Sequence, residues 1–375
     1  MSALDRPWAI NWDVTYACPL RCAHCYSESG RRASRQLSLE DMFRVADALI
    51  SLKPQSIQFS GGEPLLVKGV FQVAERIAQA GIPVILYTSG WLLDERLVAD
   101  VARIFSQVHL SLDGATAKVH DTVRAKPGSF ERAMKALGLL NEAVREQRQR
   151  GGKVLTFGID GVVVRSNFHQ LEEYCTAIVP RFPELKFLSL GAAVPSGLAN
   201  RPGYADHELL TDDQLWLLGS GGFTRYLQTL APASVKVSTT DGLLLQMHPD
   251  HIASGRALRG LMHVEPDGAV RSMPIYEGTV GNLLEEPAQV LWERALARHL
   301  DPYLAETLGP VRTMKEWAKA ARRIDLHYGS DQVRARIFLR QNYRPPRPSD
   351  SGILGVVRRT PPPGRDLGPA HAPVH

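Results

Sequence analysis

The stretch Thr15-Tyr-Ala-Cys-Pro-Leu-Arg-Cys-Ala-His-Cys-Tyr26 holds three of the four cysteines in this 375-residue chain. Cys18, Cys22 and Cys25 have the spacing C-x3-C-x2-C, so three thiols lie on one short segment. A cube-shaped iron–sulfur cluster has four irons, and three thiolates leave one iron without a protein ligand. An iron left open in this way can bind a small molecule. The spacing therefore predicts a catalytic [4Fe–4S] centre.

A structural zinc site, or thiols that are close by chance, is the alternative interpretation. Structural zinc needs four closed ligands, usually as two pairs, and no second C-x2-C or Cys/His pair follows in the sequence. His24 could be a fourth ligand. As the direct neighbour of Cys25, however, it is expected to point away from a metal that Cys25 binds. We therefore favour the iron–sulfur interpretation.

A second motif, Ile57-Gln-Phe-Ser-Gly-Gly-Glu-Pro64, is an apolar run that ends in two glycines, an acid and a proline. The apolar run is typical of a buried parallel strand. Gly61 and Gly62 allow a tight turn that presents backbone polar groups to a ligand, and the carboxylate of Glu63 follows. The motif lies about 36 residues beyond the cysteines, the spacing of one β-α-β unit.

Apolar strand patterns alternate with helical patterns along the first half of the chain, which predicts an α/β fold with a parallel sheet covered by helices. The cysteines, Gly61, Thr88 and Asp113 follow the carboxyl ends of expected strands, where such folds bind ligands. Six strands indicate a partial (β/α)6 barrel, open on one side to a large substrate. The expected strands are 9–15, 56–60, 83–88, 107–113, 154–164 and 186–190, and the expected helices are 39–51, 69–80, 94–105, 130–147 and 168–179.

These motifs, in this order, resemble the radical S-adenosylmethionine (radical SAM) superfamily over about residues 8–300. The resemblance implies that the three cysteines bind one [4Fe–4S] cluster and that the open iron binds the amino and carboxylate groups of SAM. It also implies that the Gly-Gly-Glu-Pro turn contacts the SAM amino group. The residues assigned on this basis are Cys18, Cys22 and Cys25 for the cluster, and Tyr26, Ser60, Gly61, Gly62, Glu63 and Pro64 for SAM.

Two further strand ends match the family. Val84-Ile-Leu-Tyr-Thr-Ser-Gly90 resembles the third strand, with Ser89 in place of the usual asparagine. Val108-His-Leu-Ser-Leu-Asp-Gly114 resembles the fourth strand, and the resemblance implies that its Ser111 and Asp113 lie near the ribose and the methionine end of SAM.

The last match in this region is the arginine of His120-Asp-Thr-Val-Arg124. In the family this arginine binds the SAM carboxylate, and a guanidinium suits bidentate carboxylate binding. Each of these polar residues alone could cap a strand or be a solvated charge, but their ordered succession favours a common site. The resemblance thus adds Thr88, Ser89, Ser111, Asp113 and Arg124 to the SAM site.

The region after residue 200 differs in character. Leu261-Met-His-Val-Glu-Pro-Asp-Gly-Ala-Val-Arg-Ser-Met-Pro274 places two apolar segments around a Pro-Asp-Gly turn, a strong hairpin signal. Gly281-Asn-Leu-Leu284 and a helical pattern from Pro287 to Leu300 follow. This region resembles the twitch or SPASM extension of radical SAM enzymes that modify peptides and cofactors. Members with an auxiliary cluster place a cysteine seven residues beyond the proline of the turn, where this chain has Met273.

No cysteine follows Cys175, so an auxiliary cluster of the usual kind is not expected. Such a cluster can anchor a substrate or accept an electron, and both roles would be missing. The hairpin would then be stabilised by packing alone. His248, His251 and His263 could in principle replace the absent ligands, although scattered histidines of the core or surface are far more common.

The run Cys25-Tyr-Ser-Glu-Ser-Gly-Arg-Arg32 with Gln36-Leu-Ser38 is similar to peptide maturases of the mycofactocin and pyrroloquinoline quinone type, and haem-modifying members are also similar. The resemblance implies reductive cleavage of SAM to a 5′-deoxyadenosyl radical, which abstracts hydrogen from a peptide or cofactor precursor. The alternatives are a radical epimerase or another enzyme that modifies a sugar, nucleoside or amino acid in antibiotic biosynthesis. A degenerate cluster-binding partner and a zinc scaffold are the non-enzymatic alternatives. Catalytic residues that touch the substrate are not assigned.

Cys175 is the only thiol outside the cysteine loop and could return a hydrogen atom to a substrate radical, as in radical epimerases. It is expected two turns past a helix start near Asn167, roughly 11 Å from the catalytic face. Its side chain falls with Leu171 and Ile178 on an apolar stripe, where a small thiol is ordinary core packing. We therefore predict that Cys175 is structural.

Composition favours a soluble enzyme of the cytoplasm, with 44% hydrophobic residues and a net charge of +5. Clustered thiols suit a reducing compartment, and neither a long apolar stretch nor a signal region indicates a membrane. No basic patch with stacking aromatics indicates nucleic acid. Reduction of the cluster needs an external electron donor of the flavodoxin or ferredoxin type.

Because residue 8 already begins the first strand, a leader peptide, if one is bound, would be presented by a separate protein.

Four parts are expected along the chain. The tail is rich in Pro, Arg, Gly and Ser, a composition typical of disorder. The parts are the partial barrel at 1–200, a twitch/SPASM-like extension without an auxiliary cluster at 201–300, a helical region at 301–342 and a disordered tail at 343–375.

Overall fold

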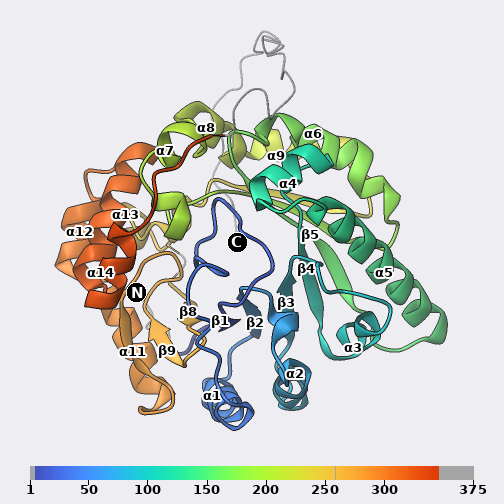
Figure 1. The fold of residues 1–375 in the computed structure, drawn as a ribbon, viewed down its shortest axis with the longest axis horizontal. Helices are drawn as coiled ribbons and strands as arrows, with labels where there is room; N and C mark the ends of the chain where they lie inside the picture. The colour runs from blue at the N-terminus through green and yellow to red at the C-terminus, as the bar shows by residue number, and fades with distance from the viewer. Residues whose placement is uncertain (1–4, 258, 346–375) are drawn as a thin grey trace. The chain divides into compact units, whose positions relative to one another are not determined.

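The computed structural model describes residues 5–257 and 259–345, so the part 346–375 of the expected tail lies outside the described residues. The described residues form a ten-stranded sheet in the order β10-β9-β8-β1-β2-β3-β4-β5-β6-β7 (Figure 1). The strands are β1 (Ala9–Thr15), β2 (Ser56–Gly61), β3 (Val84–Thr88), β4 (Gln107–Ser111), β5 (Thr156–Val163), β6 (Phe187–Ala192), β7 (Lys236–Thr240), β8 (Leu261–Val264), β9 (Ala269–Arg271) and β10 (Thr279–Asn282).

The helices lie between and after these strands. The first of them begins after Ser38, whose side chain caps it by accepting a hydrogen bond from the backbone N–H of Asp41. The helices are α1 (Leu39–Ser51), α2 (Val70–Gln79), α3 (Leu97–Ile104), α4 (Ala117–Arg124), α5 (Ser129–Arg150), α6 (Leu171–Glu173), α7 (Tyr204–His207), α8 (Asp212–Gly219), α9 (Gly221–Leu230), α10 (Pro249–Ala253), α11 (Ala288–Arg298), α12 (Pro302–Leu308), α13 (Met314–Tyr328) and α14 (Asp331–Phe338).

The α/β fold and its parallel sheet are confirmed. All neighbours from β1 to β6 pair in parallel, in chain order, as the alternation of strands and helices predicted. A further strand, β7, was missed because only Val237 of Lys236–Thr240 is buried, so the segment lacks an apolar run. β8 pairs in parallel with the other edge of β1. The described edge strands β7 and β10 do not pair, so the sheet is open.

The expected hairpin is also present. β8 and β9 pair antiparallel, and the Glu265 N–H donates to the carbonyl of Ala269 across the Pro-Asp-Gly turn. Gly268 takes a φ of +83°, the left-handed conformation that favours glycine at this position. β7 to β10 extend the same sheet as β1 to β6, and the domain boundaries given above stay a prediction.

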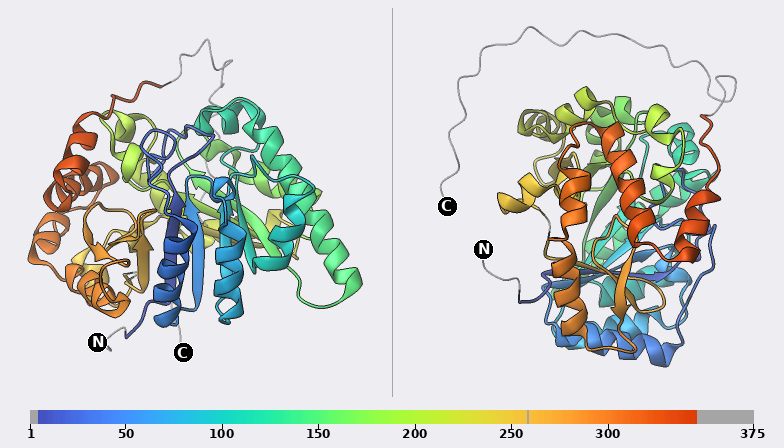
Figure 2. Two further views of the ribbon diagram at one scale, coloured as in Figure 1. Left: turned by 60° about the horizontal axis from the view of Figure 1, so that its bottom comes forward. Right: turned by 90° about the vertical axis from the view of Figure 1, so that its left-hand side faces the viewer.

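One face of the parallel sheet carries the hydrophobic core. Residues of this face such as Leu86, Val108 and Leu188 are fully buried, and α1, α2, α3 and α5 follow one another along the sheet (Figure 1). The opposite face carries Asn11, Asp13 and other polar residues, because successive side chains of a strand point to opposite faces. Figure 2 shows the loop after β1, in blue, beyond the carboxyl ends of β1 and β2.

The helix expected at 168–179 is irregular. It consists of a 3₁₀ turn, the short α6, a π turn at Tyr174–Ile178 and a second 3₁₀ turn at Val179–Arg181. Cys175 is fully buried together with Leu171 and Ile178, as the apolar stripe predicted. No helix among the described residues is long and apolar enough to cross a bilayer.

Candidate active site at the cysteine loop

The Gly-Gly turn after β2 closes directly on the chain that leads to Cys18. The Gly62 N–H donates to the Thr15 carbonyl at 2.7 Å, and the Glu63 N–H donates to the Ala17 carbonyl at 2.9 Å. A Cβ on Gly62 would lie only 2.0 Å from the Ala17 oxygen, which leaves no room for any side chain. The glycine is therefore required for the close approach of two motifs that are far apart in the sequence.

Glu63 fastens this turn to the end of β3. Its side chain is fully buried and accepts hydrogen bonds from the Thr88 hydroxyl at 2.8 Å and from the Ser89 N–H at 3.0 Å, and also from the Ser89 hydroxyl. The structure therefore brings together three residues that were assigned to SAM. The polar side chains of Glu63, Thr88 and Ser89 hydrogen-bond to one another. Pro64, the next residue, is buried.

Arg124, at the end of α4, reaches the cysteine loop. Its Nη1 donates to the Cys22 Sγ at 3.7 Å, and its Nε lies 2.6 Å from the buried carboxylate of Asp113. His24 Nε2 lies 3.4 Å from the same carboxylate, so this histidine faces Asp113. Burial raises the pKa of Asp113, but the charges of Arg124 and His24 outweigh it and hold this pKa below its ordinary value.

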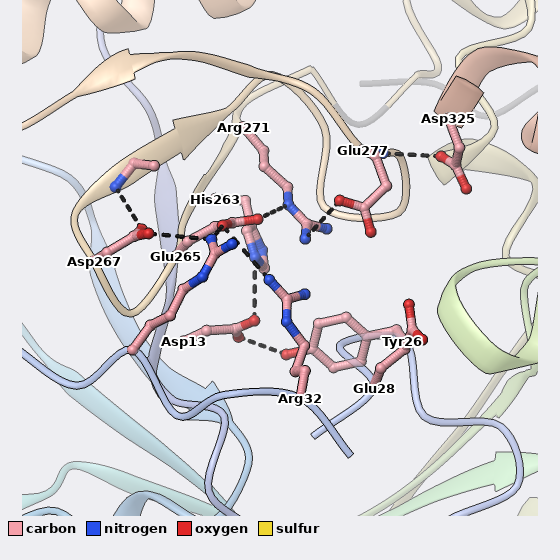
Figure 3. Close-up of polar contacts among 12 residues, drawn as sticks. Asp13, Tyr26, Glu28, Arg32, His263, Glu265, Asp267, Arg271, Glu277 and Asp325 are labelled. Atoms are coloured by element: carbon pink, nitrogen blue, oxygen red, sulfur yellow. Dashed lines mark hydrogen bonds and ion pairs between the residues drawn. The ribbon is translucent and has the colours of Figure 1, made fainter. Parts of the chain in front are cut away.

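Tyr26 and Ser60 both contact Asp13 of β1. The Tyr26 hydroxyl donates to Asp13 at 2.6 Å and the Ser60 hydroxyl donates to the same oxygen at 2.9 Å. His263 of β8 approaches the other Asp13 oxygen to 3.3 Å, and Figure 3 shows Asp13 between Tyr26 and His263. The Asn11 side chain contacts the second ring nitrogen of His263 at 3.0 Å.

Arginine side chains surround the backbone of the cysteine loop. Arg31 donates to the Cys22 carbonyl at 3.2 Å, and Arg201 donates to the Ala23 carbonyl at 3.3 Å. Arg21 donates to the Cys18 and Leu20 carbonyls, each at 2.9 Å. Positive charge near the cysteines stabilises their thiolate form, which is the form that binds a metal.

A segment that the sequence did not single out also holds the loop. The Leu198 N–H, after β6, donates to the Cys25 carbonyl at 3.0 Å. Gly197 has a φ of +52°, and a Cβ there would lie 2.1 Å from the Tyr26 carbonyl oxygen. The only signal for this contact is the Pro195-Ser-Gly197 turn, which many loops share.

The thiols fit the [4Fe–4S] cluster that the motif implies. All three are free, and Cys22 is buried while Cys18 and Cys25 are partly exposed. Burial raises the pKa of Cys18 to about 12 and that of Cys22 to about 11, although Arg124 lowers the latter. Thiols with raised pKa values bind iron well only when the metal displaces the proton. Within 5–257 and 259–345 no group of three His, Cys, Asp or Glu side chains is arranged around a single metal ion.

The remaining positions that the sequence singled out have separate surroundings. Ser111 is partly exposed at the end of β4, beside Asp160 of β5. Met273, at the position of the auxiliary cysteine, is fully buried. His248 contacts Arg312 at 3.2 Å and His251 contacts a backbone carbonyl, whereas His263 lies in the sheet beside Asp13. His248 and His251 thus lie side by side, with ring centres 5.7 Å apart, and among the described residues no third ligand completes a metal site with them.

Sequence reasoning missed a row of rings on the polar face of the sheet. Tyr87 stacks on His109 with ring centres 4.3 Å apart, and the Phe187 ring lies 4.6 Å from the same imidazole. Gly158 permits this, because a Cβ there would lie 2.5 Å from the Phe187 ring. Burial lowers the pKa of His109 to about 4, so its ring is neutral at pH 7. All three rings are partly exposed, so they are candidates to face a substrate.

The order and contacts of these motifs agree with comparisons of the whole sequence. The family described as the Radical SAM superfamily matches residues 12–166. Residues 12–166 thus correspond to a radical SAM domain. The match contains the three cysteines, the Gly-Gly turn, Asp113 and Arg124.

Curated relatives of the radical SAM domain include two maturation or synthesis enzymes. Mycofactocin maturase MftC of Mycolicibacterium smegmatis is 33% identical over 180 residues, which cover 48% of this chain and 43% of the relative. AdoMet-dependent heme synthase of Methanosarcina barkeri is 34% identical over 141 residues, which cover 37% of this chain and 40% of the relative. The chain thus spans about half or less of the length of these relatives.

Solved structures share the fold. Streptococcus suis SuiB bound to S-adenosylmethionine has a TM-score of 0.59 at 16% identity, and covers 82% of this chain and 69% of its own. The enzyme anSMEcpe with bound AdoMet has a TM-score of 0.58 at 18% identity, and covers 89% of this chain and 100% of its own. At these identities the likeness concerns the partial barrel fold alone.

Proposed function

We propose that this protein is a radical SAM enzyme that abstracts a hydrogen atom from a peptide or cofactor precursor. One observation carries the proposal: three free thiols lie on a loop that closes against the Gly61–Gly62 turn at the carboxyl end of the parallel sheet. When bound, a [4Fe–4S] cluster and SAM supply one-electron cleavage of a carbon–sulfur bond and hence a reactive carbon radical.

The protein's own residues would bind, orient and shield these groups. Cys18, Cys22 and Cys25 would hold the cluster, and Arg124 stabilises negative charge on the Cys22 sulfur. Glu63 keeps the Gly-Gly turn in place through Thr88 and Ser89, so these residues would shape the SAM site from behind. Ser60, Tyr26, Ser111 and Asp113 complete the set that we assign to SAM.

A peptide or cofactor precursor is favoured as the substrate class by two kinds of support. The relatives include a mycofactocin maturase, and SuiB has been crystallised with a precursor peptide, SuiA. The open sheet with a partly exposed row of Tyr87, His109 and Phe187 offers a face on which an extended substrate could lie. An external electron donor, and a separate protein that presents the peptide, belong to the same proposal.

The proposal is tested by isotope transfer. The protein is reconstituted anaerobically with iron and sulfide, reduced, and given SAM with deuterated precursor peptides or, separately, deuterated amino sugars and nucleosides. We expect deuterium in 5′-deoxyadenosine only with a peptide or cofactor precursor. Deuterium transfer from a sugar or nucleoside would instead show that the proposed substrate class is wrong. A colourless protein that leaves SAM intact would show that the protein is not a radical SAM enzyme.

A further inference from the structure

Glu28, three residues beyond Cys25, is anchored by the C-terminal end of the described chain. Arg336 of α14 lies 2.9 Å from its carboxylate, and Arg340 lies 2.8 Å from it. The Glu28 side chain is 7% exposed, and its φ is +53°, a conformation that non-glycine residues rarely adopt. Such a conformation persists only where the surroundings fix it.

Arg336 also connects Glu28 to the hairpin region. Arg336 also pairs with Glu277, which follows β9, and Glu277 pairs with Arg271 of β9 at 3.1 Å. Arg271 in turn lies 2.6 Å from Glu265, at the end of β8. Figure 3 shows Arg271 between the carboxylates of Glu265 and Glu277. Both acids are 5% exposed, so these pairs are shielded from solvent.

The chain of ion pairs returns to the cysteine loop. Arg35 lies 3.2 Å from Glu265, and its other nitrogen donates to Gln332 of α14 at 2.8 Å. Arg32 reaches the same carboxylate at 4.0 Å and stacks over the Tyr16 ring. Acid and base thus alternate along a series of pairs that begins at Glu28 and ends at Arg35, and the backbone between these two residues closes the circuit. We call this circuit the charge ring: Glu28, Arg336, Glu277, Arg271, Glu265 and Arg35.

The buried ion pairs of the charge ring are better suited to fixing positions than to adding stability. Buried ion pairs add little net stability, because desolvation offsets their attraction, but removing one partner leaves a buried charge unpaired. Their directional contacts fix the relative positions of the segments that they join. Here the segments are the loop after Cys25, the β8–β9 hairpin and α14, which are joined across as many as 308 positions of sequence.

We infer that the charge ring is a positioning device for the cluster-binding loop, so that Arg336 and Glu28 set how firmly Cys25 and the other ligands are held. The inference rests on the proposed function for its consequence, but the positioning itself concerns contacts within the protein. Arg336 is the key member, because its planar guanidinium bridges Glu28 and Glu277 at once. A lysine there would keep the charge but lack the planar fork that spans both carboxylates.

The test compares Arg336→Gln with Arg334→Gln, a matched control on the same helix. Arg334 is 45% exposed, pairs with Asp331 within α14 and donates to the Leu326 and His327 carbonyls of α13, so it contacts no member of the charge ring. In the cluster-free full chain, hydrogen exchange of residues 18–35 should become about tenfold faster or more in Arg336→Gln and stay unchanged in Arg334→Gln. Arg336→Lys should lie between the two, and Glu28→Gln should match Arg336→Gln. Equal exchange in Arg336→Gln, Glu28→Gln and the control would overturn the inference.

A second measurement uses the reconstituted protein. Iron–sulfur absorbance should be lost to a chelator about tenfold faster in Arg336→Gln, and its reduced cluster should show an altered electron paramagnetic resonance signal when SAM is added. Arg336→Lys should restore part of that signal, and identical signals in all variants would contradict the positioning role. If no variant bound a cluster, the proposed function would fail, and the exchange data would still decide on the charge ring.

Discussion

The guanidinium of Arg124 joins the Cys22 sulfur, 3.7 Å from its Nη1, to the buried carboxylate of Asp113, 2.6 Å from its Nε. Sequence resemblance assigned both Arg124 and Asp113 to SAM. In the structure they pair with each other, so Arg124 links the cysteine loop to the end of β4.

Arg124→Gln should therefore destabilise the fold as well as the site. It leaves the fully buried Asp113 without its charge partner, and breaking a buried pair costs about 3–5 kcal/mol. Because the pKa of Asp113 is held below 3.8, the loss should appear above that pH and vanish as the pH falls below it. Urea unfolding of the cluster-free protein measures it, and adding Asp113→Asn should recover much of the loss. A change of less than about 1 kcal/mol would show that the pair is not needed.

Gly62→Ala tests the contact between the two motifs. A Cβ at this position would meet the Ala17 carbonyl oxygen at 2.0 Å, so the turn and the cysteine loop must move apart. We expect a loss of about 1–3 kcal/mol in unfolding free energy and reduced iron loading.

The control is Gly138→Ala in α5, where nothing lies within 4 Å of the added Cβ. This change should stabilise the protein by about 0.5–1 kcal/mol, because alanine is a better helix former than glycine. Equal behaviour of the two variants in urea unfolding would argue against the close approach at Gly62.

The parallel strands and the hairpin could be predicted because their signals are local. β1 to β6 are apolar runs between helical patterns, and the Pro-Asp-Gly turn specifies its own hairpin. β7 was not predicted because polar residues flank Val237, and α4 was not predicted because His120–Arg124 was interpreted as a motif rather than as part of a helix.

The charge ring could not be predicted at all. Glu28 and Arg336 are 308 positions apart, and in a sequence a buried charge looks the same as a solvated one. The expectation that the hairpin is held by packing alone was therefore wrong, since Arg271 and Glu265 tie it to neighbouring segments through buried ion pairs. The SAM contacts of the assigned residues stay predictions, because they depend on a bound ligand.

Asp325→Asn should stabilise the protein at alkaline pH. Burial and the neighbouring Glu277 carboxylate raise the pKa of Asp325 from 3.8 to about 7, so the folded protein favours the protonated acid. Ionisation therefore reduces stability progressively as the pH rises from 3.8 to about 7, and the full penalty is present above that. Asparagine keeps the oxygen that accepts from the Glu277 N–H.

Thermal unfolding at two pH values checks this expectation. The melting temperature of Asp325→Asn should exceed that of the wild type near pH 8 and approach it near pH 4. The exposed control Asp331→Asn on the next helix should show no such difference. A variant that is less stable than the wild type near pH 8 would mean that Asp325 is ionised and paired in the folded protein.

Cys175→Ala should leave the chemistry intact. The thiol is fully buried in the hydrophobic core and its sulfur approaches only the Leu171 carbonyl, at 3.8 Å, among the hydrogen bonds of the described residues. We expect a loss of about 1 kcal/mol in stability, with unchanged cleavage of SAM and, once the substrate is known, unchanged product. Full SAM cleavage with loss of product would instead make Cys175 the hydrogen donor and favour a radical epimerase.

The most direct test of the central claim is the formation of 5′-deoxyadenosine from SAM by the reduced, reconstituted protein. The wild type, with about four irons per chain, should produce 5′-deoxyadenosine and methionine, and Cys18→Ala, Cys22→Ala and Cys25→Ala should produce neither. Cys175→Ala should behave as the wild type in the same assay. Retained SAM cleavage in any of the three loop variants, or no cleavage by the iron-loaded wild type, would contradict the assignment of the cysteine loop.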